Sequence, residues 1–297
     1  MRARQLEVFT AVMRSGTVTA AARMLNISQP ALSQILLHAE DELGFALFDR
    51  VKGRLQPTPE ALELFPEAER LFSGLEGLRR KTADLRLGRA GLVRVGASQP
   101  PAMALLPQAL AAFRSEHPDV VLRSHIAPIA TLINMLRDGD VAMAMALDDR
   151  MPPDMVVEPL GRTGFCCLLP EGHPLAARAR IGFADLRGET VISYRGNTRP
   201  ADELVQAARA EKAGFSIQIE IDVSITAAGF VAAGLGVAVV DALLPWSQFK
   251  GVVVRPILDG PTMPLSLLSP VARTLSRAEE ILRDHIRKAA ADWRNAI

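Results

Sequence analysis

The sequence predicts an α/β protein with a helix-turn-helix near its N-terminus, one long helix, and a larger α/β region made of two lobes. Three observations support this prediction. Two short helical patterns separated by one turn occupy residues 18–40, a heptad repeat of apolar residues starts at residue 59, and apolar strands alternate with helical stretches from residue 92 onward. We therefore divide the chain at residues 1–58, 59–90 and 91–297, with lobe I at about 91–163 and 270–297 and lobe II at about 164–269.

Capping residues and apolar spacing predict the helix-turn-helix. Thr17 or Thr19 can cap the first helix, Asn26 suits the residue that ends it, and Ser28 can cap the second helix. The apolar residues that we expect to face inward are Ala21, Ala22, Leu25, Leu32, Ile35 and Leu36.

The outward side of the second helix carries amides and hydroxyls, which can hydrogen-bond to base edges, and its N-terminus favours a phosphate. A basic turn around Gly53 follows and suits phosphate contacts. Double-stranded DNA is therefore the first partner to test, although an alanine-rich helical pair in a core and a solvated basic loop are the plainer alternatives. The residues expected at DNA are Ser28, Gln29, Pro30, Ser33, Gln34, Arg50, Lys52 and Arg54.

From Pro59 to about Leu87 the pattern is helical, with Thr58 as its cap. Its apolar seam keeps spacings of four and three, as in two helices that pack along their length. The seam consists of Leu64, Ala68, Leu71, Leu75, Leu78, Thr82 and Leu85. We expect a dimerisation helix, with a single helix lying on its own domain as the alternative.

Beyond a hinge at Gly88 and Gly91, strands and helices alternate. Strands are predicted at residues 92–97, 120–126, 141–147, 165–169, 190–194, 217–222, 237–240 and 265–269, and helices at 105–117, 129–137, 201–213, 226–233, 242–246 and 275–293. Crossing segments that join two such lobes leave a cleft between them.

Polar residues gather where predicted strands end and helices begin, which is where ligands bind in α/β proteins. The candidate ligand residues are Ser98, Gln99, Thr131, Arg195, Asn197, Thr198, Arg199, Ser224, Thr226 and Asp241. Donors at the helix ends and an arginine can bind a carboxylate, while Asp241 can bind a cationic group. A ligand that carries both groups is an amino acid or a derivative of one. The alternatives are helix capping for the hydroxyls and Asp241, and surface solvation for the arginines.

Composition and motifs argue against several classes of protein. The net charge of +1 argues against a general polyanion binder, and no leader precedes the first helix, so we expect a cytoplasmic protein. The longest uncharged stretch, residues 223–240, contains three glycines and divides into a helix and a strand, so we expect no membrane contact. Cys166 and Cys167 are adjacent and the five histidines lack ligand spacing, which predicts no metal. Gly234–Gly236 precedes a strand rather than following one, so we expect no cofactor and no catalytic residue.

Four motifs in order give a resemblance to a known family: S-Q-P-A-L-S at 28–33, E-D-E-L-G at 40–44, L-F-D-R at 47–50 and L-Q-P-T-P at 55–59. On these the chain resembles the LysR-type transcriptional regulators over its full length. The resemblance implies a winged helix-turn-helix, a linker helix, and a two-lobed effector-binding domain like the periplasmic solute-binding proteins. It also implies promoter DNA, a small-molecule effector and RNA polymerase as partners, in a homodimer or homotetramer.

The chain departs from this family in its second helix, where members usually carry arginines at the positions of Gln34, Leu37 and His38. More of the phosphate contact must then come from the basic turn and from Arg2, Arg4 and Arg23. Within the family, residues 234–241 are similar to regulators of opine and basic amino-acid metabolism, and residues 50–58 to the lysine-biosynthesis regulator. An aromatic or other carboxylate effector is the alternative, and a solute-binding or interaction protein without DNA binding is a further one.

Overall fold

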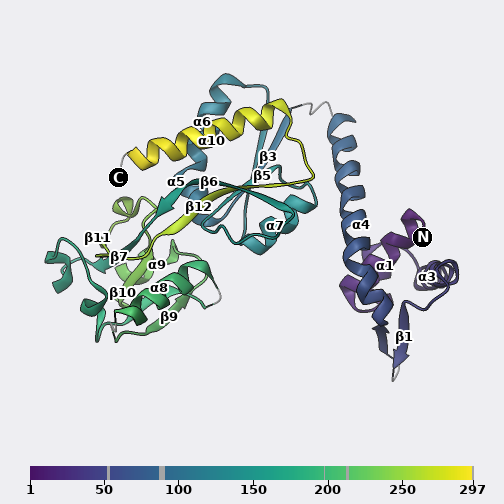
Figure 1. Ribbon diagram of the computed structural model, residues 1–297, viewed down its shortest axis with the longest axis horizontal. Helices are drawn as coiled ribbons and strands as arrows, with labels where there is room; N and C mark the ends of the chain where they lie inside the picture. The colour runs from purple at the N-terminus through teal and green to yellow at the C-terminus, as the bar shows by residue number, and fades with distance from the viewer. Residues whose placement is uncertain (52–53, 87–90, 197, 212–213, 296–297) are drawn as a thin grey trace. The chain divides into compact units, whose positions relative to one another are not determined.

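The computed structural model describes residues 1–51, 54–86, 91–196, 198–211 and 214–295. These residues form two compact units, an N-terminal unit that ends with the helix α4 and a larger unit that begins with the strand β3. Each unit has its own hydrophobic core. Figure 1 follows the chain through both units from purple to yellow.

The N-terminal unit consists of helices packed on one small core, followed by a hairpin. Its elements are α1 (Ala3–Ser15), α2 (Val18–Met24), α3 (Gln29–Leu43), the antiparallel strands β1 (Phe48–Val51) and β2 (Arg54–Pro57), and α4 (Pro59–Arg86). Phe9, Leu32 and Leu47 are completely buried in this core. The hairpin that follows α3 is the wing, so the winged helix-turn-helix is confirmed.

The caps around the turn between α2 and α3 are the ones that the sequence predicts. Thr17, rather than Thr19, accepts a hydrogen bond from the Ala20 amide at 3.2 Å, and Ser28 accepts one from the Ala31 amide at 3.3 Å. Asn26 adopts a φ of 52°, a left-handed conformation that asparagine tolerates better than most residues. The hydroxyls of Thr17 and Ser28 therefore cap α2 and α3, the helices on either side of the turn.

The helix α4 runs for 28 residues from Pro59, and Thr58 caps it, since the Thr58 hydroxyl accepts the Ala61 amide at 3.2 Å. The early part of its seam packs on its own unit, where Ala68 is buried and Leu64 partly so. Later leucines of the seam face solvent, since Leu71 is 66% and Leu78 is 58% exposed. The first part of the helix therefore packs on its own unit, and the later part leaves an apolar stripe exposed, as a helix that pairs with a second helix would.

Lobe I is a five-stranded sheet with the order β4-β3-β5-β12-β6, covered by helices. Its strands are β3 (Leu92–Ala97), β4 (Val121–Ile126), β5 (Met143–Ala146), β6 (Met155–Thr163) and β12 (Met263–Pro270), and its helices are α5 (Gln99–Ala104), α6 (Leu106–Glu116), α7 (Ile129–Arg137) and α10 (Arg277–Asn295). The last helix, yellow in Figure 1, packs beside α6, so the chain returns to the lobe in which the larger unit began.

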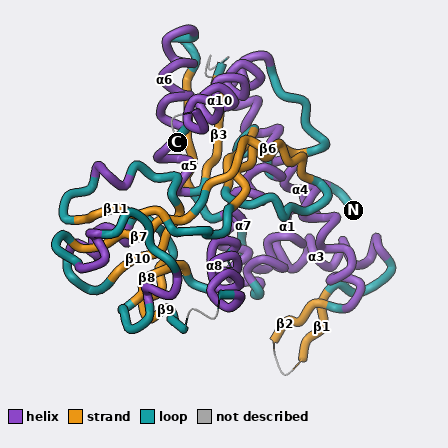
Figure 2. The backbone as a smooth tube through the Cα atoms, turned by 60° about the vertical axis from the view of Figure 1, so that its left-hand side comes forward, coloured by secondary structure: helices purple, strands orange, loops and turns teal. Residues whose placement is uncertain are grey.

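Lobe II is a second five-stranded sheet with the order β11-β7-β10-β8-β9. It contains β7 (Phe165–Pro170), β8 (Val191–Tyr194), β9 (Ile217–Ile221), β10 (Val237–Asp241), β11 (Val252–Pro256), α8 (Arg199–Ala210), α9 (Thr226–Ala232) and the short 3-10 helices η1 (Pro174–Ala177), η2 (Phe183–Leu186) and η3 (Trp246–Gln248). Figure 2 shows the strands of this lobe in orange below and beside those of lobe I. The strands β8, β9 and β10 are parallel, so their carboxyl ends share one edge.

Five features differ from the sequence-based prediction. The strands β6 and β11 and the helix α5 were not expected, and residues 242–246 form a turn and the start of η3 rather than a helix. The strand β12 pairs with β6 from Met263 and with β5 from Ser266, so it belongs to the sheet of lobe I although we expected that lobe to resume only at about residue 270. Pro159 and Gly161 interrupt the alternation of apolar and polar residues in β6, so this strand could not be recognised from its periodicity.

Two further sequence-based expectations concern single segments. No helix in the part of the chain that the structure describes is both long enough and apolar enough to span a bilayer. Cys166 and Cys167 lie on β7 as free, buried thiols, and burial raises the pKa of Cys167 to about 12. They serve as core side chains, as expected for adjacent residues that point to opposite faces of a strand.

Candidate functional site

The first candidate site is the outward face of α3. Gln29, Pro30 and Gln34 are exposed, and Ser33 is partly buried. Ser28 is occupied as the helix cap. The opposite face holds the helix on the core through Leu32, Leu36 and Ala39. This arrangement leaves a polar N-terminal face free to enter a groove of DNA.

The end of α3 is tied to the wing by Glu40. Its carboxylate accepts hydrogen bonds from the Leu47 amide at 2.7 Å and the Phe48 amide at 3.1 Å. Sequence reasoning used Glu40 only as part of a motif and missed this role. Because the carboxylate bridges the helix and the first strand of the hairpin, it sets where the wing begins relative to α3.

The basic residues expected at phosphates are only partly described. Arg50 and Arg54 lie in the paired strands of the wing, but their side chains and the whole of Lys52 fall outside the described residues. Arg2 lies 3.6 Å from Glu42 and Arg4 lies 2.6 Å from Glu7. Both N-terminal arginines thus have acidic partners in this conformation, which phosphates would have to replace.

The second candidate site lies where lobe I meets lobe II in the larger unit. Ser224, in front of α9, donates its hydroxyl to Gln99 Oε1 at 3.0 Å, and Gln99 begins α5 of lobe I. Ser98 precedes it, and its hydroxyl oxygen is shielded from solvent without a hydrogen-bond partner among the residues described. Three of the residues predicted to bind a ligand, Ser98, Gln99 and Ser224, are therefore brought together from the two lobes.

Asp241 lies beneath this contact and is completely buried. Its Oδ2 accepts the Tyr194 hydroxyl at 2.7 Å, and its Oδ1 accepts the backbone amides of Leu243 at 3.1 Å and Leu244 at 3.3 Å. Burial raises the pKa of Asp241, and the hydrogen bond from the Tyr194 hydroxyl opposes this shift. In this conformation the carboxylate caps the turn after β10, as in the capping alternative.

The Tyr194 hydroxyl is bound on two sides. It accepts the backbone amide of Asp241 at 3.0 Å while it donates to the carboxylate of the same residue. Burial raises the pKa of Tyr194 well above its usual range, so the hydroxyl keeps its proton as a donor. Sequence reasoning missed Tyr194, although its position as the last residue of a predicted strand is the signal that marked the other candidates.

The remaining candidates are spread more widely. Thr198 caps α8 by accepting the Ala201 amide, Thr226 donates to the Val223 carbonyl, and Arg195 pairs with Asp222 at 3.2 Å. Thr131 is exposed on α7, and Asn197 lies outside the described residues. For Thr198 the structure favours the capping alternative, and for Arg195 the surface alternative.

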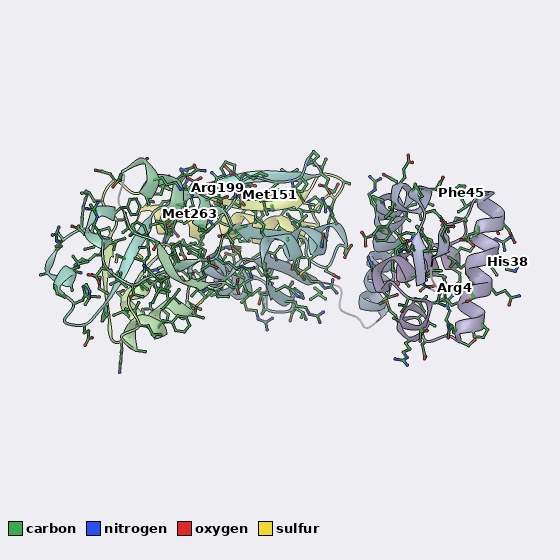
Figure 3. The ribbon with its side chains drawn as sticks, turned by 90° about the horizontal axis from the view of Figure 1, so that it is seen from below. Arg4, His38, Phe45, Met151, Arg199 and Met263 are labelled. Carbon is green, nitrogen blue, oxygen red and sulfur yellow. The ribbon has the colours of Figure 1, made fainter. Side chains whose placement is uncertain are left out.

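Arg199 instead belongs to a set of ion pairs that joins the lobes. It lies 3.5 Å from Asp149 of the loop after β5, and Arg150 of that loop lies 3.1 Å from Asp202 on α8. Figure 3 labels Arg199 beside Met151, the next residue of the loop. We call Asp149, Arg150, Arg199 and Asp202 the lobe clamp. Local sequence patterns do not reveal these pairs, because each joins residues about fifty positions apart in the chain.

The two units together define a class of protein. Residues 3–62 match the family model described as a bacterial regulatory helix-turn-helix protein of the lysR family, and residues 86–291 match the LysR substrate binding domain. The chain belongs to the LysR family of bacterial transcriptional regulators. It is a DNA-binding transcriptional regulator with an effector-binding domain, and not an enzyme. The alternative of a solute-binding protein without DNA binding is therefore wrong.

Named relatives match over nearly the full chain. The regulatory protein NocR of Agrobacterium fabrum is 29% identical over 97% of both chains. The transcriptional activator protein LysR of Escherichia coli is 30% identical over 95% of this chain and 91% of its own. The octopine catabolism/uptake operon regulatory protein OccR of Rhizobium meliloti is 29% identical over 86% of this chain and 85% of its own.

Solved structures agree on the fold. Full-length CbnR complexed with its target DNA matches 97% of this chain and 100% of its own with a TM-score of 0.68 at 19% identity. A full-length OxyR variant from Pseudomonas aeruginosa matches 97% of this chain and 95% of its own with a TM-score of 0.63 at 23% identity. A winged helix-turn-helix, a linker helix and a two-lobed α/β domain are thus arranged in the same chain order.

Proposed function

We propose that the effector of this regulator is an amino acid or an amino-acid derivative, bound between the lobes at Ser98, Gln99 and Ser224. The observation that supports this site is the hydrogen bond between Ser224 and Gln99, because it links the lobes through two polar side chains at strand and helix ends. The unpartnered hydroxyl of Ser98 adds a donor and acceptor at the same place.

The chemistry of this site suits a ligand that carries both an anionic and a cationic group. The Ser98 and Ser224 hydroxyls and the Gln99 amide can donate to a carboxylate. The buried carboxylate of Asp241 lies directly behind Ser224 and favours a cationic group on the ligand side of that residue. The relative OccR, whose name refers to octopine catabolism and uptake, supports the same class of ligand.

In this conformation Ser224 and Gln99 bond to each other, so an effector that enters between them exchanges this hydrogen bond for bonds to itself. Such an exchange changes the energy of the lobe contact, and a ligand shifts a conformational equilibrium only through such differential contacts. We propose that the change in lobe arrangement alters the bend or spacing that the dimer imposes on promoter DNA and thereby the access of RNA polymerase.

A thermal-shift screen tests the effector class. The full-length protein is melted with arginine, lysine, ornithine and octopine, and with benzoate and succinate as carboxylates that lack an amine. We expect stabilisation by at least one amine-bearing ligand and none by the simple carboxylates. An equal or larger shift with benzoate or succinate would instead assign the alternative carboxylate class.

Two variants test the site itself. Gln99→Ala and Ser224→Ala each remove one hydrogen bond to the ligand, which corresponds to a loss of about fivefold to tenfold in affinity. Ser115→Ala is the matched control, because the Ser115 hydroxyl donates to the Ala112 carbonyl on the exposed side of α6. Unchanged affinity in both site variants would move the effector site elsewhere.

We also propose that the working form is a homodimer, or a homotetramer built from it, that acts in the cytoplasm where promoter DNA lies. The exposed leucines of α4 support a helix-to-helix dimer contact, since an apolar stripe of this length is costly to leave in water. Sedimentation of the full-length chain tests the stoichiometry, and a monomer at micromolar concentration would contradict it.

Gln29→Ala tests the DNA contact of α3. Because this side chain is exposed at the helix N-terminus, its loss leaves the fold intact and removes a bidentate partner for adenine. A footprint on the protein's own promoter region should weaken or shift, while the larger unit melts at an unchanged temperature. An unaltered footprint would count against this assignment.

A further inference from the structure

The outward face of α3 continues past its polar residues to Leu37, a large apolar side chain that is 59% exposed. The core beneath the helix is built from Leu32, Leu36 and Ala39, and Leu37 does not belong to it. Neither packing within this unit nor the polar chemistry of its neighbours explains a leucine at this position.

Helix geometry places Leu37 in line with the residues expected at base edges. At about 100° per residue, Pro30, Ser33 and Leu37 fall within an arc of about 60° on one face of α3. Leu37 lies eight residues beyond Gln29, a rise of about 12 Å, which is close to the width of the DNA major groove. The face therefore reaches across one groove and still includes Leu37.

The next turn of α3 limits how much of the helix can lie in the groove. Asp41 is the next exposed residue on this face, and a carboxylate is repelled by phosphates. Glu40 fixes the helix to the beginning of the wing through the Leu47 and Phe48 amides, so the position of Leu37 is set by the folded unit. His38, labelled in Figure 3, is exposed beside it.

A leucine offers a DNA groove no hydrogen bond and no charge. Among the atoms that base pairs expose in the major groove, the 5-methyl group of thymine is the apolar one, and aliphatic or aromatic side chains contact it. We propose that Leu37 reads a thymine in each half-site of the operator through this methyl group. The inference rests on the DNA binding of the family and adds a sequence preference that the polar residues of α3 do not supply.

Replacing thymine by deoxyuridine tests this contact, since the exchange removes only the methyl group. The probe is a duplex that the full-length protein itself selects from a random pool. Each thymine is replaced in turn, and the dissociation constants of the wild type and Leu37→Ala are measured on every duplex. Alanine favours helix, so the variant keeps α3 folded.

We expect one thymine per half-site at which deoxyuridine weakens wild-type binding about fourfold, from the transfer energy of one buried methyl group, and about fifteenfold when both half-sites are changed. In Leu37→Ala this sensitivity disappears at those two thymines and persists at any others. Leu62→Ala is the matched control, because Leu62 is 57% exposed on α4 and lies outside the seam of that helix. It should keep the wild-type pattern.

Two results would overturn the inference. One is a wild type that binds its selected duplex with no loss at any substituted thymine, and the other is a set of sensitive thymines that is the same in Leu37→Ala as in the wild type. Failure of the DNA-binding function itself looks different, because the selection then returns no duplex that the full-length protein binds in a salt-dependent manner.

Discussion

Replacing Tyr194 by phenylalanine removes one hydroxyl that bonds twice to Asp241. The hydroxyl donates to the carboxylate at 2.7 Å and accepts the Asp241 amide at 3.0 Å, both in the interior of lobe II. A hydrogen bond to a charged group contributes about 1.5–3 kcal/mol, and a buried amide left without a partner costs about 1–3 kcal/mol. Phenylalanine keeps the apolar contacts of the ring, so we expect Tyr194→Phe to lower the free energy of unfolding by about 3 kcal/mol.

Urea unfolding followed by tryptophan fluorescence measures this loss where it occurs. Trp246 is buried and donates its indole to the Asp241 carbonyl at 2.6 Å, and Trp293→Phe leaves it as the sole tryptophan. With a denaturant slope of about 3 kcal/mol/M, the midpoint of the Trp246 transition should fall by about 1 M. Because the protein has several units, the comparison uses this transition alone.

Ser193→Ala is the matched control for Tyr194→Phe. Ser193 is also buried on the same strand, but its hydroxyl donates to the uncharged Val239 carbonyl at 2.7 Å. We expect this variant to lose only about 1 kcal/mol. If Tyr194→Phe cost no more than Ser193→Ala, the reasoning that a charged, doubly bonded pair supports the effector site would be refuted.

Three more predictions follow from the same structure. Leu71→Asp with Leu78→Asp should dissociate the dimer, because both leucines are exposed on α4; sedimentation checks this, and unchanged mass would exclude the helix as the contact. Burial raises the pKa of Asp241, so the folded state binds a proton there at a higher pH than the unfolded state does. The folded protein therefore gains stability from this group as the pH falls through the raised pKa. Asp241→Asn should flatten the dependence of stability on pH in that range, and melting curves between pH 4 and 8 measure this effect. In the lobe clamp, a double-mutant cycle between Arg150→Ala and Asp202→Ala should give a coupling of about 0.2–1 kcal/mol that vanishes in 1 M salt, and a salt-independent value would argue against an ionic contact.

Local patterns in the sequence predicted most of the fold. The caps at Thr17, Ser28 and Thr58 act as expected because a hydroxyl before a helix acts on amides only three residues away. The helix over residues 129–137 was placed at its observed bounds for the same reason. By contrast, β6 was missed because Pro159 and Gly161 disguise a strand whose pairing with β12 spans about a hundred residues.

The candidate effector site was predicted only in part, again because of chain distance. The sequence marked Gln99 and Ser224 separately, but their contact joins residues 125 positions apart. Tyr194 was passed over as the end of a strand, while Arg199 was assigned to the ligand without its partner Asp149. A helix end can be recognised from its neighbours in sequence, whereas the partner of a charged side chain is set by the tertiary fold.

The place of β12 in lobe I has a consequence for how the protein is made. This strand lies between β5 and β6, and it is the only sheet partner of β6 among the described strands, yet it is synthesised about a hundred residues later. All strands of lobe II lie between β6 and β12 in the chain, so on the ribosome lobe II can complete its sheet before the fifth strand of lobe I has been synthesised. A transcript cut short before residue 263 would therefore yield a nascent chain with a whole lobe II beside an open, aggregation-prone edge at β5.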